Sequence, residues 1–405
     1  MQSDSRKQGI YLGLLLAATS LEIVQLSPYS VLWTAPLILL AAMMIAWAAE
    51  SAQFFIAQGF ALAILAWLQT MPEFAVEAVL AWKQKVPLLM ANLTGALRLL
   101  TGLGWPMIYC VAAFFYRRKY KKPLRAILLD RNHSVEVAGL LLPLIYCSFI
   151  TWKGTLSLWD AGVLIAIYVA YLLVLSRIPP EEAESIEEME RIPRAIVTSS
   201  RGMRNFWITG LFVGGGLLIY YMAEPFLGSL LSLSVVLGVP NFVFVQWVAP
   251  FVSEFPEKVS AFYWARTIDR ASMALMNMVS SNINQWTLLP AMLVVVYAWS
   301  VGAPAEITFD SQQKLELWMT LGQSLVGMLF LINMRLEWWE ATSLFVLWAI
   351  QFALSPLETN AHGVITVIYF IWAGVELIRI VFGWRKALAF KIFWEVVRQP
   401  RAPVS

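Results

Sequence analysis

Long apolar runs alternate with short polar stretches from one end of the chain to the other. A run of about 18 or more apolar residues is long enough to cross a bilayer as a helix. We expect twelve such spans, near residues 8–26, 31–49, 53–82, 86–116, 136–152, 158–177, 206–237, 241–265, 270–299, 317–334, 339–355 and 363–383. Because helices satisfy their own backbone hydrogen bonds in lipid, the pattern predicts an all-α polytopic membrane protein with the lipid bilayer as its partner.

Basic residues gather in alternate connections between these spans. Clusters of Lys and Arg occur within residues 117–125, 191–204, 266–270 and 385–391. Such clusters mark cytoplasmic loops, and with twelve spans all four fall on the same side. We therefore expect both termini in the cytoplasm. The compact loops, and the lack of a targeting sequence beyond the hydrophobic helices, favour the inner (plasma) membrane of a prokaryote.

Polar chemistry inside the spans concentrates at two Pro-Glu steps, one in each half. They lie at residues 69–73 (Gln-Thr-Met-Pro-Glu) and 253–257 (Ser-Glu-Phe-Pro-Glu). A carboxylate at membrane depth is costly and marks an ion or substrate path, and the proline interrupts the helix beside it. In the predicted orientation one of these helices runs outward and the other inward. The repetition therefore indicates an inverted internal repeat that meets near the midplane.

Composition excludes several classes of function. The 405 residues are 60% hydrophobic and include two cysteines and two histidines. Cys110 and Cys147 are expected to be buried, apolar-like side chains. The chain has no phosphate-binding loop, no nucleophile–histidine arrangement and no metal-binding cluster, and no nucleic-acid partner is expected. Paired glutamates can act as general acid and base, but without such partners the sequence favours a protein that is not an enzyme and has no cofactor.

The two halves resemble the cation/calcium antiporter superfamily, which includes the membrane region of sodium/calcium exchangers. Repeats of that family carry a Gly-Thr-Ser-x-Pro-Glu motif, followed by a motif similar to Asn-x-x-Gly-Ser-Asn. In the second half, residues 253–257 and 277–282 (Asn-Met-Val-Ser-Ser-Asn) follow this order. In the first half, residues 69–73 are followed by 92–97 (Asn-Leu-Thr-Gly-Ala-Leu). The spacing from proline to asparagine is 20 residues in the first half and 21 in the second.

The resemblance implies two five-helix halves of inverted topology with a helix added at each end. The implied division is an additional N-terminal transmembrane helix (1–30), a first repeat (31–177), a polar cytoplasmic connector (178–205), a second repeat (206–356), and an additional C-terminal transmembrane helix with a basic cytoplasmic tail (357–405). It also implies an activity, the exchange of calcium or another divalent cation for sodium or protons by alternating access.

The same resemblance implies an ion-binding set. Glu73 and Glu257 would be the shared metal ligands, because the family's Pro-Glu glutamates coordinate the transported cation. Hydroxyl and amide oxygens nearby would complete the set, namely Thr70, Ser253, Asn92, Asn277 and Ser280 or Ser281. Hard cations take oxygen ligands of these kinds, and calcium takes about six to eight of them.

Four charged residues depart from the family pattern. Glu254 replaces a hydroxyl, Glu77 adds an acid one turn beyond Glu73, and Arg98 and Lys258 are charge-compensating cations. With both Pro-Glu carboxylates included, these groups sum to −2 when ionised. A divalent cation, two monovalent cations or protons must then neutralise the site. Arg98 would be a fixed cation that occupies what is otherwise an ion site.

A different pairing stays open at this point. Lys258 and Glu254 are four residues apart and can pair on one helix face, and Arg98 can neutralise Glu77. Residues 95–97 (Gly-Ala-Leu) have lost two polar ligands of the family motif. The alternative function is therefore a non-transporting structural or signalling membrane protein descended from the exchanger fold. The sequence does not predict the oligomeric state.

Overall fold

The structure, a computed structural model, describes residues 23, 26–52, 67–68, 70–176, 189–355 and 359–398. Almost all of the predicted first span lies outside these residues, as does the beginning of the predicted span 53–82. The acidic first part of the predicted connector also lies outside them.

Helices make up most of the described chain, as the hydrophobic pattern predicts. Those of the first half are α2 (Val31–Ala52), α4 (Met71–Trp82), α5 (Val86–Leu99), the π-helical turn η4 (Leu100–Gly104), α6 (Trp105–Tyr120), α7 (Ser134–Gly139), α8 (Leu141–Lys153) and α9 (Leu158–Leu175). Short 3-10 helices at Pro28–Ser30 and Arg131–His133 precede α2 and α7.

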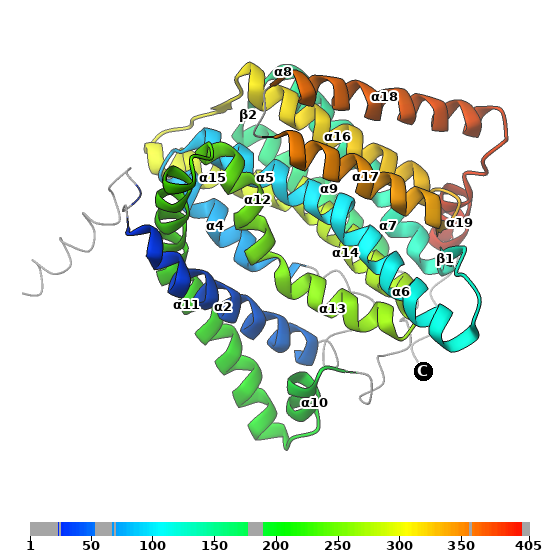
Figure 1. The fold of residues 1–405 in the computed structure, drawn as a ribbon, viewed down its shortest axis with the longest axis horizontal. Coiled ribbons are helices and arrows are strands. Elements are labelled where there is room, and N and C mark those ends of the chain that lie inside the picture. Colours follow the sequence, from blue (N-terminus) through cyan, green and yellow to red (C-terminus); the bar gives the residue numbers. More distant parts are fainter. Residues whose placement is uncertain are drawn as a thin grey trace, which may run out of the picture.

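The end of the predicted connector is itself helical. Its helices are α10 (Arg191–Val197), α11 (Arg201–Leu237), α12 (Asn241–Ser253), α13 (Phe255–Arg266), α14 (Ala271–Trp286), α15 (Leu288–Val301), α16 (Ser311–Leu331), α17 (Trp338–Leu354), α18 (Thr359–Val381) and α19 (Leu388–Arg398). The sequence did not predict α10 or α19. In the bundle, α16 and α18 lie on the side away from α2 and α11 (Figure 1).

Six helical stretches of the described residues are long and apolar enough to cross a membrane. They are Pro28–Ala52, Val86–Tyr120, Arg131–Lys153, Leu158–Leu175, Arg201–Leu237 and Asn360–Val381. The protein is therefore a multi-pass membrane protein. The count of twelve crossings stays a prediction, because several of the remaining predicted spans are divided into shorter helices.

Two predicted spans of the second half are broken near their middle. Glu254, with φ −90° and ψ 0°, separates α12 from α13, and Pro256 follows in the first turn of α13. Proline lacks the N–H that a continuing helix needs, so it starts a new helix instead. Thr287, with φ −125° and ψ −78°, separates α14 from α15. In the first half the corresponding long helix continues from α5 to α6 through the π-helical turn η4.

Two short strand pairs correct the all-α prediction. Antiparallel β1 (Ala126–Leu128) pairs with β4 (Arg335–Glu337), and antiparallel β2 (Thr155–Leu156) pairs with β3 (Ile307–Thr308). Each pair takes one strand from each half of the chain. The β1 and β2 strands lie at opposite ends of the bundle, so the halves are joined at both ends (Figure 1).

Two glycines allow close contacts between helices of different halves. A Cβ atom at Gly215 would lie 2.9 Å from the carbonyl oxygen of Ala41, so α11 and α2 pack closely there. A Cβ atom at Gly95 would lie 1.8 Å from the carbonyl oxygen of Gln246, so α5 and α12 cross at backbone contact. The glycine at position 95, which matches the glycine of the family motif, is thus fixed by packing.

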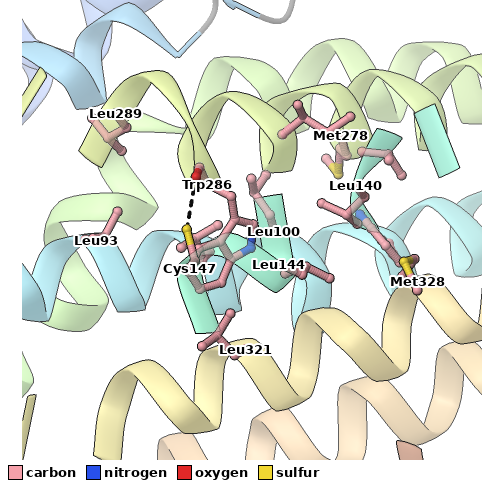
Figure 2. Close-up of a cluster of buried hydrophobic side chains, with 14 of the residues drawn as sticks. Leu93, Leu100, Leu140, Leu144, Cys147, Met278, Trp286, Leu289, Leu321 and Met328 are labelled. Carbon is pink, nitrogen blue, oxygen red and sulfur yellow. Dashed lines mark hydrogen bonds between the residues drawn. The ribbon is translucent and has the colours of Figure 1, made fainter. Parts of the chain in front are cut away.

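The apolar core lies where α5, α8, α14 and α16 meet (Figure 2). Cys147 is buried there, and its thiol donates to the carbonyl oxygen of Trp286 at 3.2 Å. This confirms Cys147 as a core side chain. The prediction is wrong for Cys110, which is exposed on α6 because that helix turns this face outward.

We predict that Gly95→Ala destabilises the protein by about 3 kcal/mol, because overpacking costs about 1–3 kcal/mol and here the obstacle is backbone. The thermal unfolding midpoint of detergent-solubilised protein measures the effect. Gly216→Ala on α11 is the control, since its added methyl group meets open space. Equal midpoints for the two variants would contradict the close crossing.

Candidate cation site

Each Pro-Glu step places its glutamate in the first turn of a helix. Glu73 lies in the first turn of α4 and Glu257 in the first turn of α13, and both are buried. The unpaired N–H groups and the dipole at a helix N-terminus favour negative charge there. The local sequence therefore positions both carboxylates inside the bundle and partly stabilises them.

Gln285 of α14 connects the two Pro-Glu segments. Its side-chain N–H donates to Glu73 Oε2 at 2.5 Å and to Glu254 Oε1 at 3.0 Å. The other oxygen of Glu254 accepts from Lys258 Nζ at 2.6 Å, as the spacing of four residues predicts. Gln285 was not identified from the sequence. The available signal was an amide in a membrane helix, four residues after Ser281 and therefore on the same helix face.

Two further carboxylates each receive one hydrogen bond from a helix beside them. Asn92 of α5 donates to Glu77 Oε1 at 3.0 Å, and the hydroxyl of Ser281 on α14 donates to Glu257 Oε1. Positions 277, 281 and 285 are four residues apart and therefore share the face of α14 that meets this site. Asn277 is buried on that face, one turn before Ser281.

Several buried oxygens at this site have no hydrogen-bond partner among the described residues. They are Glu73 Oε1, Glu77 Oε2, Glu257 Oε2, Asn92 Oδ1 and Gln285 Oε1. Buried polar atoms are normally paired, so an orphaned group requires a reason. Carboxylate and amide oxygens are the ligands of hard cations, and this donor set fits such an ion.

The carboxylates surround the site without forming a compact chelate. Glu77, Glu254 and Glu257 all lie close enough to Glu73 for their charges to repel its charge. Within the described ranges, however, no group of three or more His, Cys, Asp and Glu side chains has the spacing of a metal site. A bound cation would therefore share its coordination with amide and hydroxyl oxygens or draw the carboxylates together.

The remaining predicted oxygen donors lie at the site's margin or face elsewhere. The hydroxyls of Thr70 and Ser253 donate to backbone carbonyls of the preceding turn, those of Trp67 and Ala249. Ser280 points toward α9, where its oxygen lies 3.1 Å from the hydroxyl of Tyr171. Of the two serines left open by the sequence, Ser281 is the one that contacts a Pro-Glu carboxylate.

Arg98 does not pair with Glu77, and that alternative is wrong. Its guanidinium forms an ion pair of 2.8 Å with Glu316 of α16, and both side chains are buried. Glu316 lies just before the predicted span 317–334, so the hydrophobic pattern does not place it at membrane depth. His362 also differs from expectation. It is buried, and its Nδ1 lies 2.5 Å from Oε1 of Glu316, a contact that the sequence analysis did not predict.

This pairing changes the charge of the cation site. Arg98 and Glu316 cancel each other, and Lys258 and Glu254 do the same. Glu73, Glu77 and Glu257 are left without an ion pair among the described residues, which gives −3 instead of the expected −2 when all three are ionised. Charge of this size inside an apolar bundle must be neutralised by cations or protons.

A multi-pass helical bundle with buried, uncompensated carboxylates at interrupted helices defines a membrane transporter of cations. The sequence model of the sodium/calcium exchanger protein family matches residues 28–177 and 207–355. The chain therefore belongs to this family, whose members are antiporters and not enzymes. The match confirms the resemblance seen in the two motifs.

Solved structures with the same fold include two kinds of exchanger. The H+/Ca2+ exchanger CAX is 30% identical in sequence, with a TM-score of 0.81, and the match covers 95% of this chain and 96% of that one. The sodium-calcium exchanger NCX_Mj is 17% identical, with a TM-score of 0.53 over 80% of this chain and 97% of that one. The latter match concerns the fold alone. No curated protein sequence matches the chain.

We predict that Lys258→Met destabilises the protein by about 3–5 kcal/mol, because it leaves the buried carboxylate of Glu254 without its cation. Adding Glu254→Gln to this variant removes the unpaired buried charge and should restore most of the lost stability. Unfolding midpoints of the two single variants and the double variant test the pair. Independent, additive effects would show that the two side chains do not interact.

Proposed function

We propose that the protein is a secondary active antiporter that exchanges calcium, or another divalent cation, for sodium or protons. Transport would proceed by alternating access to a midplane site formed by α4, α13 and α14. The protein would lie in the inner (plasma) membrane with both termini in the cytoplasm. The carrying observation is the set of three buried carboxylates, Glu73, Glu77 and Glu257, each with an orphaned oxygen.

The charge of the site supports exchange rather than permanent binding. A divalent cation neutralises two of the three negative charges, and one proton or monovalent cation neutralises the third. When the divalent cation leaves, two monovalent ions can replace it and keep the site neutral. The state with ionised carboxylates and no bound cation has the highest free energy. Release of the divalent cation is therefore followed by binding of monovalent cations or protons, and the reverse.

The ligand roles follow from the contacts. Glu73 and Glu257 are the principal cation ligands, and Glu77 is the added acid that holds the proton or second ion. Gln285 and Asn92 each use their N–H groups on a carboxylate and leave the amide oxygen toward the cation. Lys258 keeps Glu254 out of the exchange by pairing with it.

The strand pairs support the inverted relation of the two halves. The β1 strand follows α6 and pairs with β4, which precedes α17, whereas β2 precedes α9 and pairs with β3, which precedes α16. A two-fold rotation that relates the halves, about an axis in the membrane plane, would place β1 on β3 and β4 on β2. It would therefore superpose one strand pair on the other. This symmetry of the strand pairs supports the proposal that the two repeats are inverted.

A non-transporting role is the second candidate. Arg98 and Lys258 are both fully paired, so part of the polar interior is a closed network of ion pairs. A protein with no transport function would need such a network only for its fold. The orphaned oxygens argue for transport, because a purely structural network leaves few buried groups without partners.

We predict that calcium flux into proteoliposomes depends on an imposed sodium or proton gradient and falls to background in Glu73→Gln and Glu257→Gln. Each substitution keeps the side-chain volume but removes one of the charges that bind the cation. Glu306→Gln, at an exposed position between α15 and α16, is the matched control and should transport like the parent.

A folded parent protein without flux under either gradient, for calcium and for other divalent cations, would overturn antiport. It would favour the non-transporting role. Flux that persists in both glutamine variants would instead show that the cation site does not depend on Glu73 and Glu257.

We predict that Ser281→Ala lowers the apparent affinity for calcium about 10-fold or more, since a hydrogen bond to a charged group contributes about 1.5–3 kcal/mol. Ser280→Ala is the neighbouring control, because this serine faces Tyr171. The substrate dependence of flux measures both. An equal loss in the two variants would contradict the assignment of Ser281 to the site.

A further inference from the structure

The helix α19 has one apolar face, and the protein itself covers that face. Ala389 and Val396 are buried, and Leu388, Ile392 and Phe393 pack against the main core. The helix contacts α7 and the 3-10 helix that precedes α7. The apolar face of α19 therefore needs neither a membrane nor a second protein to cover it.

Ion pairs hold α19 against the bundle at both ends. Just before the helix, the buried side chain of Arg385 pairs with Glu340 of α17 at 2.6 Å and with Glu376 of α18 at 3.1 Å. Toward the other end, Glu395 pairs with Arg131 at 2.7 Å. The position of α19 is thus set by the fold, and so is the direction in which its second face points.

The second face of α19 points away from the bundle and carries two cations beside a tryptophan. Lys391, Trp394 and Arg398 are exposed, and their spacings of three and four residues place them on one side of the helix. The guanidinium of Arg398 lies over the ring of Trp394, 5.4 Å from the ring centre. Among the described residues, neither Lys391 nor Arg398 forms an ion pair. Both cations are therefore available to a ligand.

An open hollow of about 370 Å³ lies over this face, lined by Lys391, Trp394, Glu395 and Arg398. Because Glu395 is paired with Arg131, the two remaining cations give the lining a net positive charge. Basic side chains bind phosphate oxygens, and an indole ring packs on the apolar part of a molecule that lies at a membrane surface. The hollow therefore suits a ligand that is anionic at one end and apolar at the other.

The residues before α19 indicate that this end of the bundle lies at a membrane surface. Helix α18 contains a candidate span, and Ile371 and Val381 are among its exposed apolar side chains, as expected of a helix that faces lipid. Phe382 and Trp384 follow, both exposed, with their rings stacked 5.7 Å apart. Aromatic side chains gather at the level of the lipid headgroups. Helix α19 begins four residues after Trp384.

The same end of the bundle carries further positive charge. Six exposed basic residues lie in the last turn of α6 and in the loop that leads to β1, namely Arg117, Arg118, Lys119, Lys121, Lys122 and Arg125. The strand β1 and the helix α19 lie at this one end (Figure 1). It is the predicted cytoplasmic side, and the cytoplasmic leaflet carries the anionic lipids. The partner that combines negative charge, an apolar body and this location is an anionic phospholipid.

We propose that Lys391, Trp394 and Arg398 on the outward face of α19 form a binding site for an anionic phospholipid. The two cations bind the phosphate of the headgroup, and the indole packs on the glycerol and the adjoining acyl carbons. The ion pairs at the ends of α19 keep this face in position whether or not lipid is bound. The site does not depend on which cation the protein transports, so its failure and the failure of antiport are separate results.

The test follows the thermal unfolding midpoint of the full-length protein in a neutral detergent as phosphatidylglycerol is added. A ligand that binds the folded state raises the midpoint. We expect a rise with phosphatidylglycerol, and none with phosphatidylcholine or with soluble glycerol phosphate at the same concentration. The amount of phosphatidylglycerol needed for half of the rise should increase about 25-fold when Lys391→Gln and Arg398→Gln are combined, because each cation near anionic lipid contributes about 5-fold.

The matched control combines Arg118→Gln with Lys122→Gln, which removes two exposed cations at the same end of the bundle but not on α19. It should require as much phosphatidylglycerol as the parent. An equal increase in both double variants would show general attraction between opposite charges and would overturn the site on α19. A parent whose midpoint does not rise with phosphatidylglycerol, or rises equally with glycerol phosphate, would overturn the lipid as its ligand.

Native mass spectrometry makes the same comparison without heating, so it also serves if a variant has a lower midpoint in the absence of lipid. The parent and the control should retain phosphatidylglycerol that the α19 variant loses. Equal retention by all three proteins would contradict the proposal.

Discussion

The carboxylates of Glu73, Glu77 and Glu257 lie inside an apolar bundle, and among the described residues each receives a hydrogen bond from a single amide or hydroxyl group. Burying ionised carboxylates with so little support is costly. The broken helices are a consequence of this constraint, because a helix that starts at the Pro-Glu step turns its N-terminal N–H groups toward the acid. In each half the proline starts a new helix, and the N-terminus of that helix stabilises the glutamate that follows the proline.

The two basic side chains near the cation site, Lys258 and Arg98, are paired with other carboxylates, so the site keeps its negative charge. Lys258 is paired with Glu254, and Arg98 is paired with Glu316 on the far side of α5. Neither cation is available to Glu73, Glu77 or Glu257. The helix α5 lies between the two polar regions and contacts both, through Asn92 on one side and Arg98 on the other.

The sequence predicted the parts of this arrangement that depend on local pattern. The helical spans, the Pro-Glu steps and the pair of Lys258 with Glu254 follow from periodicity, proline chemistry and a spacing of four residues. The partners of Arg98 could not be predicted in this way, because Glu316 is 218 positions further along the chain and lies at the edge of an apolar run. Gln285 and His362 were missed for the same reason. Their roles arise from helices that meet only in the folded bundle, and no local pattern encodes such meetings.

The exchange of strands between the halves has a consequence for how the chain folds during synthesis. The β1 strand is complete long before β4 is made, and β2 is likewise complete long before β3. The first half therefore leaves these two short strands unpaired until the second half arrives. Neither half is a finished folding unit, so a cut between them would yield two interdependent fragments.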